Sequence, residues 1–181
     1  MTKLKLSTIA HVSSAHRWSD NRVHLKEAAS LASAGYSVKL IAVEHDVDVP
    51  NTGVQVCLLP TRSRLKRMTL GSMQAVWLAF RSKAGIIHLH DPELVWAVPI
   101  LRRFARKVIY DAHENLPDQV RDKAYLNTPA RKILVVVAKG LVKLGGRADA
   151  VVAATETIAQ TFPSDRTAVV HNYPRIRSQD V

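Results

Sequence analysis

The chain has 181 residues, of which 47% are hydrophobic and 23% are charged, a balance typical of a folded globular domain. A single cysteine, Cys57, excludes a disulfide framework and a thiolate metal cluster, and it fits a reducing compartment such as the cytoplasm. The longest apolar run, residues 133–138, is too short to span a bilayer, so we expect any membrane contact to be peripheral.

The net charge of +11 favours anionic partners such as nucleic acid, acidic lipid or phosphorylated ligands. Aromatic residues make up only 6% of the chain, and no zinc finger, helix-turn-helix or aromatic-rich basic strand is recognisable. Nucleic-acid binding is therefore a minor alternative.

Strand and helix patterns alternate along the chain, which predicts an α/β fold with a mainly parallel sheet and helices on both faces. Strands are expected at residues 4–12, 36–43, 54–59, 86–90, 107–112, 148–153 and 167–170. Helices are expected at residues 22–34, 68–82, 93–104, 129–144 and 155–162, with an irregular or weakly helical segment at 117–128.

The first loop, residues 13–21, is polar and lies at the carboxyl edge of the predicted sheet, where Ser13, Ser14 and Arg17 are candidates for binding substrate. Asp20 or Asn21 is expected to cap the following helix, and Gly35 is placed to stop it. Arg22 opposes the dipole at the start of that helix, which indicates an anionic partner and makes Arg22 a further binding candidate.

A basic run, Arg62, Arg64, Lys66 and Arg67, precedes an apolar helix with Met73, Val76, Trp77 and Phe80 on one side. Two interpretations stay open: a surface that docks on anionic lipid, or a solvated loop beside an ordinary core helix. For the helix at 129–144, the run of valines is expected to pack on the sheet.

Two neighbouring predicted strands end in polar clusters, His88-Leu-His90-Asp91 and Asp111-Ala-His113-Glu114. Because parallel strands open at the same edge of a sheet, these side chains are expected to share one crevice. His90 is the better ligand candidate, and His88 is expected to be a satisfied core histidine.

The carboxylates of these clusters have structural alternatives. Asp91 is expected to cap the helix that begins at residue 93. Asp111 lies on the same side of its strand as His113, so it either orients the imidazole or serves as a cap. These residue types can also ligate a metal, but no sharp ligand spacing is present, so a metal-dependent hydrolase is a minor alternative.

The chain resembles the N-terminal half of family-4 GT-B glycosyltransferases in HVSSAHRWSDNRVHLKEAASLASAGYSVKLIAVE, IIHLHDPELVWAVPILRR, KVIYDAHENLP, ADAVVAATETIAQTF and AVVHNYP. The resemblance implies a Rossmann-like acceptor-side domain at 1–174, followed by the start of a linker at 175–181. The family's donor-binding domain, with its paired glutamates, is not in the sequence. A Gly-Gly turn common after the first strand of relatives is also missing.

The resemblance further implies a retaining glycosyltransferase that acts in polysaccharide biosynthesis without a metal or other cofactor. Such an enzyme moves a sugar from a nucleotide-sugar to a glycan or lipid-linked acceptor. His113 would contact the transferred sugar as the catalytic residue. His90, Asp91, Asp111 and Glu114 would shape the acceptor side with the first loop, and Asn172 would lie at the hinge. A stand-alone partner module of a split transferase remains an alternative.

Overall fold

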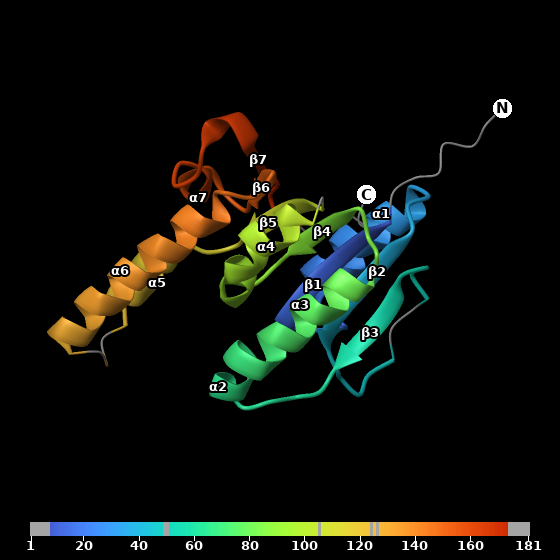
Figure 1. The fold of residues 1–181 in the computed structure, drawn as a ribbon, viewed down its shortest axis with the longest axis horizontal. Coiled ribbons are helices and arrows are strands. Elements are labelled where there is room, and N and C mark those ends of the chain that lie inside the picture. The colour runs from blue at the N-terminus through green and yellow to red at the C-terminus, as the bar shows by residue number, and fades with distance from the viewer. Residues whose placement is uncertain (1–7, 49–50, 105, 124, 126, 174–181) are drawn as a thin grey trace, which may run out of the picture.

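A computed structural model describes residues 8–48, 51–104, 106–123, 125 and 127–173. Within them, parallel strands form one sheet in the order β3-β2-β1-β4-β5-β6-β7 (Figure 1). The strands are β1 (Ile9–Arg17), β2 (Val38–Val43), β3 (Gln55–Leu59), β4 (Ile86–Leu89), β5 (Lys107–Ala112), β6 (Ala150–Ala153) and β7 (Thr167–Val169). The predicted Rossmann-like α/β fold is confirmed.

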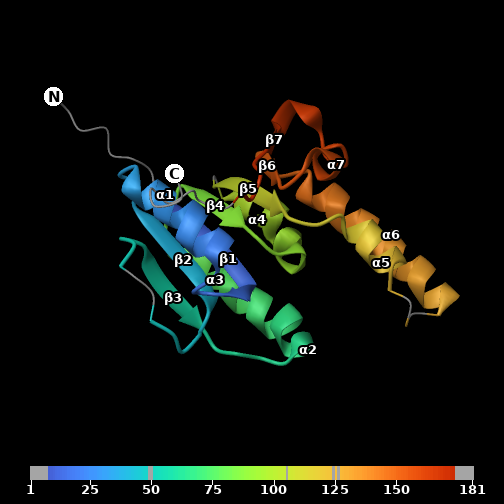
Figure 2. The same cartoon turned by 180° about the vertical axis from the view of Figure 1, so that it is seen from behind.

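Helices cover both faces of the sheet, since α3 and α1 lie on opposite sides of β1 in the two opposed views (Figures 1 and 2). The first group is η1 (Asn21–Ala28), α1 (Ala29–Ser33), α2 (Arg64–Lys66), η2 (Arg67–Gly71), α3 (Ser72–Arg81), η3 (Pro92–Ala97) and α4 (Val98–Arg103). The second group is α5 (Leu116–Arg121), α6 (Thr128–Gly145), α7 (Glu156–Ala159) and η4 (Ser164–Arg166).

The helix after β1 begins and ends where the sequence predicts. The Asp20 carboxylate accepts hydrogen bonds from the backbone N–H groups of Arg22 and Val23, so the predicted N-cap is confirmed. Gly35 follows the helix with a φ of 92°, a left-handed conformation that glycine adopts without strain. The segment η1 has π-helical hydrogen bonding, a form common near functional sites.

The strand β1 continues through Ser13 to Arg17, so the prediction of a loop from residue 13 is wrong. Its pairing with β2 becomes irregular between Val12 and Arg17. Side-chain contacts described below hold this extension in place.

The apolar side of α3, left open between a docking surface and a core helix, divides in the structure. Ala75, Val76 and Ala79 are buried. By contrast, Met73, Trp77 and Phe80 are between 42% and 60% exposed. Small side chains let the helix approach the sheet closely, and the bulky apolar face is left outside.

The helix α6 extends beyond the sheet edge together with α5 (Figures 1 and 2). Val136 is 69% exposed and Val137 is 51% exposed, so the prediction that the valine run packs on the sheet is wrong. The helix meets the sheet near its C-terminus, where Gly145 lies against the ring of Tyr110.

Residues 175–181, predicted to begin a linker, fall outside the described residues. Among the described helices, none combines the length and the apolar character that a bilayer crossing requires.

Candidate active site

The strand order changes direction between β1 and β4, and ligands of such sheets bind beside the carboxyl ends of the strands at this point. A cleft of about 1110 Å³ opens there between the sheet edge and the helices η2, η3, α5 and α6. Its polar floor includes Arg22, His90, Asp91, Asp111 and His113. The two strand-end clusters therefore share one crevice, as predicted.

Asp111 is the centre of the floor, and its side chain is fully buried. One carboxylate oxygen lies 3.1 Å from Nδ1 of His90, and the other accepts a hydrogen bond from Arg22 at 3.0 Å. Burial opposes ionisation, but the hydrogen bond with His90 and the neighbouring imidazoles hold the pKa of Asp111 below its ordinary range. This carboxylate is therefore ionised.

His113 lies beside this carboxylate, with Nδ1 3.4 Å from the Asp111 Oδ1 atom. Its ring is nearly parallel to that of His90, with ring centroids 6.0 Å apart. Both ring nitrogens are shielded from solvent and have no hydrogen-bond partner among the described residues. Burial lowers the pKa of His113 to about 4, so the imidazole is neutral at pH 7.

Arg22 has internal anionic partners, which corrects the inference of an external one from its place at the helix start. Its guanidinium pairs with Asp111 and, at 3.0 Å, with Glu27. Burial and the nearby charge of Asp111 raise the pKa of Glu27 to about 8. Arg22 still lines the cleft.

Asp91 ties β1 to the turn after β4. Its Oδ2 atom accepts hydrogen bonds from Ser13 Oγ at 2.9 Å, the Ser14 backbone N–H at 2.6 Å, and the Ala15 backbone N–H at 3.1 Å. Asp91 makes no side-chain cap bond to η3, so the predicted N-cap is wrong. Because both serines are buried against this carboxylate, they position the chain beside the cleft rather than facing it.

The remaining predicted residues are spread around the rim. Glu114 and Asn172 are exposed and line the cleft. Asn172 accepts a hydrogen bond from Lys26 at 2.7 Å. Arg17 lies outside the lining and contacts Nε2 of His45 at 2.7 Å.

His88 and His90 are both buried, at 7% and 1% exposure. The core position predicted for His88 is confirmed, but its Nε2 atom has no hydrogen-bond partner among the described residues, so it is not satisfied as predicted. His90 lines the cleft and contacts Nδ1 of His11 through its own Nε2 at 2.9 Å.

Sequence reasoning missed several members of this site. Glu27 lies on the inner side of η1, and His11 lies in the middle of β1. His16 lines the cleft, and its hydrogen bond with Asp20 raises its pKa above the ordinary value. Strand alternation from Ser13 back to His11 was the only available signal for that residue.

Two groups of side chains have ligand atoms close enough together to hold a metal. One consists of His11, Glu27, His88 and His90, and the other of His90, Asp111 and His113. The second group opens on the cleft, whereas the first lies behind it.

Comparisons with known proteins agree with this architecture. Residues 21–173 match a family model described as a glycosyl transferase 4-like domain. A search of curated proteins found no match.

Several solved glycosyltransferase structures share the fold. Sucrose-phosphate synthase from Thermosynechococcus elongatus is similar with a TM-score of 0.61 and 17% identity, over 91% of this chain and 48% of that one. The Anabaena protein Alr3699/HepE, in complex with UDP and glucose, is similar with a TM-score of 0.56 and 15% identity, over 92% of this chain and 44% of that one. Arabidopsis thaliana UGT89C1, complexed with UDP, is similar with a TM-score of 0.57 and 12% identity, over 95% of this chain and 50% of that one.

The chain spans about half the length of these three structures. Its match over most of its own length, together with the parallel sheet and the cleft at its switch point, shows that the chain belongs to the glycosyltransferase 4-like family.

Proposed function

We propose that the chain is the acceptor-binding half of a retaining glycosyltransferase, which moves a sugar from a nucleotide-sugar to a hydroxyl of a glycan or lipid-linked acceptor. The observation that carries the proposal is the cleft at the switch point, with the Asp111–His113 pair on its floor. Polar groups converging at the base of a large cleft are the expected features of a substrate site.

His113 is the residue proposed to contact the transferred sugar. Its imidazole is neutral at pH 7, and neither ring nitrogen makes a hydrogen bond to the described residues, although Nδ1 lies 3.4 Å from Asp111 Oδ1. Leaving such atoms without a hydrogen bond is unfavourable by about 1–3 kcal/mol. A small rotation of the His113 side chain would bring a ring nitrogen to the cleft surface, where a sugar hydroxyl would gain by bonding to it. A neutral ring can both donate and accept.

The proposed chemistry is front-face attack. The acceptor oxygen bonds to the anomeric carbon while the bond from that carbon to the leaving phosphate breaks, and the acceptor proton passes to a phosphate oxygen. Two observations support a reaction without a protein base. Asp111 is engaged by Arg22 and His90, and Asp91 by the serine segment of β1. Neither buried carboxylate is therefore free to take a proton.

Donor binding is assigned to a second domain outside this sequence, because the chain spans only about half the length of its structural relatives. UDP is bound in two of these relatives, so a nucleoside diphosphate sugar is the proposed donor class. Residues 1–174 would form the acceptor domain, and Asn172, at the rim of the cleft, would lie near the hinge. The chain alone would transfer no sugar.

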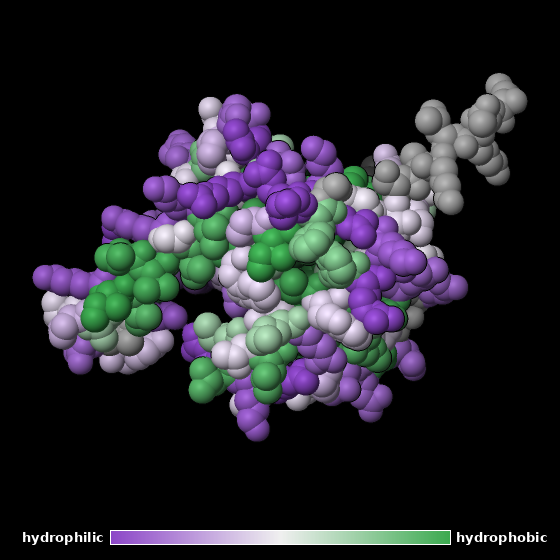
Figure 3. Space-filling model, in the orientation of Figure 1, coloured by the Kyte–Doolittle hydropathy of each residue, from purple (hydrophilic) through white to green (hydrophobic). Residues whose placement is uncertain are grey.

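The cleft mouth supports an amphipathic acceptor at a membrane surface. Leu134 and Val137 of α6 line it on one side and Met68 of η2 lines it on another, each at least 40% exposed. Leu65 of α2 is 75% exposed, and apolar side chains gather along α6 and near α2 in Figure 3. We therefore propose a cytoplasmic protein that docks peripherally on anionic lipid.

Vesicle sedimentation tests the docking step. Replacing Arg64 and Lys66 with glutamine should weaken binding to phosphatidylglycerol-containing vesicles by roughly 2 kcal/mol, about 30-fold, because each cation near the surface contributes about 1 kcal/mol. Lys83→Gln, at the opposite end of α3, is the control and should change little. Equal binding by all variants would contradict this orientation.

Amide chemical shifts test the acceptor assignment. The 181-residue protein is titrated separately with UDP-glucose and with an undecaprenyl-diphosphate-linked sugar in detergent. The lipid-linked sugar should shift His113 and Glu114, whereas the nucleotide-sugar should bind weakly. Tight nucleotide-sugar binding by this chain, or sugar transfer by it alone, would contradict the division of labour.

A further inference from the structure

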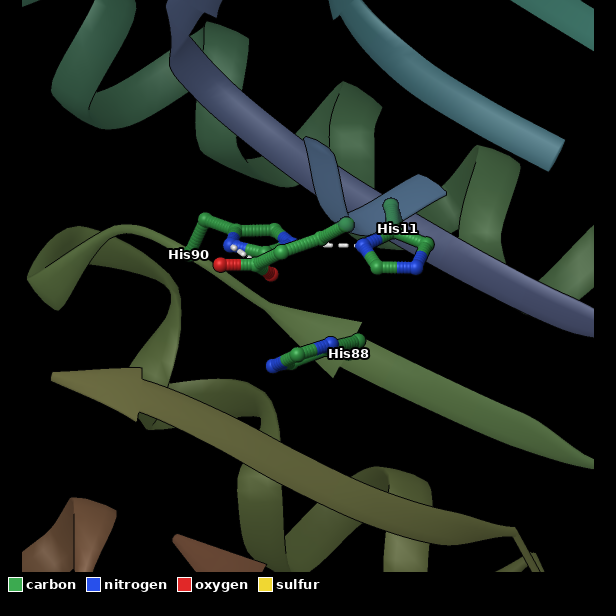
Figure 4. A group of neighbouring side chains, drawn as sticks. His11, His88 and His90 are labelled. Carbon is green, nitrogen blue, oxygen red and sulfur yellow. Dashed lines mark hydrogen bonds and ion pairs between the residues drawn. The ribbon is translucent and has the colours of Figure 1, made fainter. Parts of the chain in front are cut away.

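Three imidazoles lie together beneath the cleft floor on one face of the sheet. His11 and His88 are register partners on the adjacent strands β1 and β4, and His90 follows on the same side of the chain. The His88 ring lies 4.9 Å from that of His11 and 4.4 Å from that of His90, measured between centroids. Figure 4 shows the three rings grouped around one space.

A fourth side chain joins from the helix above. Glu27 of η1 places its Oε2 atom 4.0 Å from Nδ1 of His90. Each of the four residues can contribute one ligand atom, and these atoms all lie within 4.8 Å of one another. The cluster therefore joins β1 and the helix η1 that follows it to the end of β4, which lies far away in the sequence.

The hydrogen bonds of the cluster leave polar atoms unmatched. When His90 donates a hydrogen bond from Nδ1 to Asp111, its Nε2 atom accepts one from Nδ1 of His11. The Nε2 atom of His11 then carries a lone pair and no proton. That atom and His88 Nε2 are buried without a hydrogen-bond partner among the described residues. Buried acceptors without donors are unfavourable, and a cation would satisfy them.

We propose that His11, His88, His90 and Glu27 form a binding site for a divalent transition metal of the zinc type. Imidazole nitrogen and carboxylate oxygen are ligands that Zn²⁺ accepts, and a closed four-ligand set is the form of a structural site. The ion would pin η1 to strands β1 and β4 beneath the cleft. It takes no part in the sugar-transfer step.

The geometry needs only small adjustments to hold such an ion. Tetrahedral bonds near 2.0–2.1 Å place ligand atoms about 3.3 Å apart. Nδ1 of His11 and Nε2 of His90 are 2.9 Å apart, and coordination through this nitrogen of His11 would move its proton to Nε2. The four ligand atoms all lie within 4.8 Å of one another. Changes of about 1 Å in side-chain position would complete the site.

The surroundings also match those of a metal centre. His90 is oriented by Asp111, the carboxylate–histidine arrangement that commonly fixes the ring of a metal ligand. Arg22 holds both Asp111 and Glu27 in place. Asp111 is thus a positioning residue for the cluster, while its other oxygen faces His113.

Metal binding by the whole 181-residue protein tests the proposal. After dialysis against chelator, Zn²⁺ is titrated in competition with a chromophoric chelator, and the protein is then analysed for bound metal. The expected result is one tightly bound ion per chain, with His88→Ala and Glu27→Gln each weakening the affinity at least about ten-fold. His45→Ala removes an imidazole outside the cluster and should leave the affinity unchanged.

Co²⁺ substitution keeps the test decisive should a variant fail to fold. Wild-type protein loaded with Co²⁺ should give the intense visible bands of a four-coordinate site. X-ray absorption at the zinc edge, measured on a separate zinc-loaded sample, should indicate imidazole ligands. Only millimolar zinc binding, an octahedral Co²⁺ spectrum, or unchanged affinity in folded His88→Ala and Glu27→Gln would each overturn the proposal.

Discussion

Replacing Asp91 with alanine should destabilise the protein by about 3–5 kcal/mol. Ser13 Oγ and the backbone N–H groups of Ser14 and Ala15 donate to one buried oxygen of this carboxylate at 2.6–3.1 Å. A charge-assisted hydrogen bond contributes roughly 1.5–3 kcal/mol, and one oxygen can satisfy about two donors fully. Removing it also leaves buried backbone N–H groups without an acceptor.

Urea denaturation of the whole chain measures the loss as a lower midpoint with an unchanged slope. Asp91→Asn keeps one acceptor oxygen and should lose only about 1–2 kcal/mol, because the charge assistance disappears. Asp118→Ala is the control, since Asp118 pairs with Arg121 on the surface, where such pairs contribute about 0–1 kcal/mol. An Asp91→Ala midpoint equal to that of the control would refute the reasoning.

Two further predictions concern α6 and the rim. Gly145→Ala should destabilise by about 1–3 kcal/mol, because the new Cβ would lie 2.7 Å from the buried Tyr110 ring, whereas Gly140→Ala should stabilise by roughly 1 kcal/mol, since its Cβ would meet no atom within 4 Å. NMR titration should give His16 a pKa above its ordinary 6.5, which Asp20→Asn should lower towards that value. Because the folded pKa exceeds the unfolded one, the pair stabilises below about pH 6.5, and this contribution is lost as the pH rises through the folded pKa.

Thermal or urea unfolding checks the glycine pair, and equal effects of the two substitutions would show that α6 does not approach Tyr110 as described. A His16 pKa unchanged by Asp20→Asn would show that the carboxylate does not set it.

Local sequence signals were enough for most elements of the fold. The strand at 107–112 was predicted with its observed bounds, because an apolar run is flanked by a lysine and a histidine. The convergence of His90 and His113 was also predictable, since neighbouring parallel strands end at one edge.

Contacts that depend on strand order could not be predicted from the sequence. Nothing local indicates that β1 lies beside β4, so the His11–His90 contact and the seat of Asp91 against Ser13 could not be foreseen. Both contacts join residues almost 80 positions apart.

The buried sides of the helices could not be predicted for a different reason. An apolar stripe does not tell which side of a helix meets the sheet when small residues occupy the other side. On α3, Ala75 and Ala79 allow the closest approach, and Trp77 remains outside. The helix α6 extends beyond the sheet edge (Figure 1), and Val136 and Val137 remain exposed.

Turnover of a His113→Ala variant tests the proposed function most directly. In the proposed two-domain enzyme, His113→Ala should lower kcat about 100-fold or more, because a group that stabilises the transition state is removed. The urea midpoint of this domain should stay close to that of the parent. Turnover close to that of the parent enzyme would contradict the assignment of this cleft floor to sugar transfer.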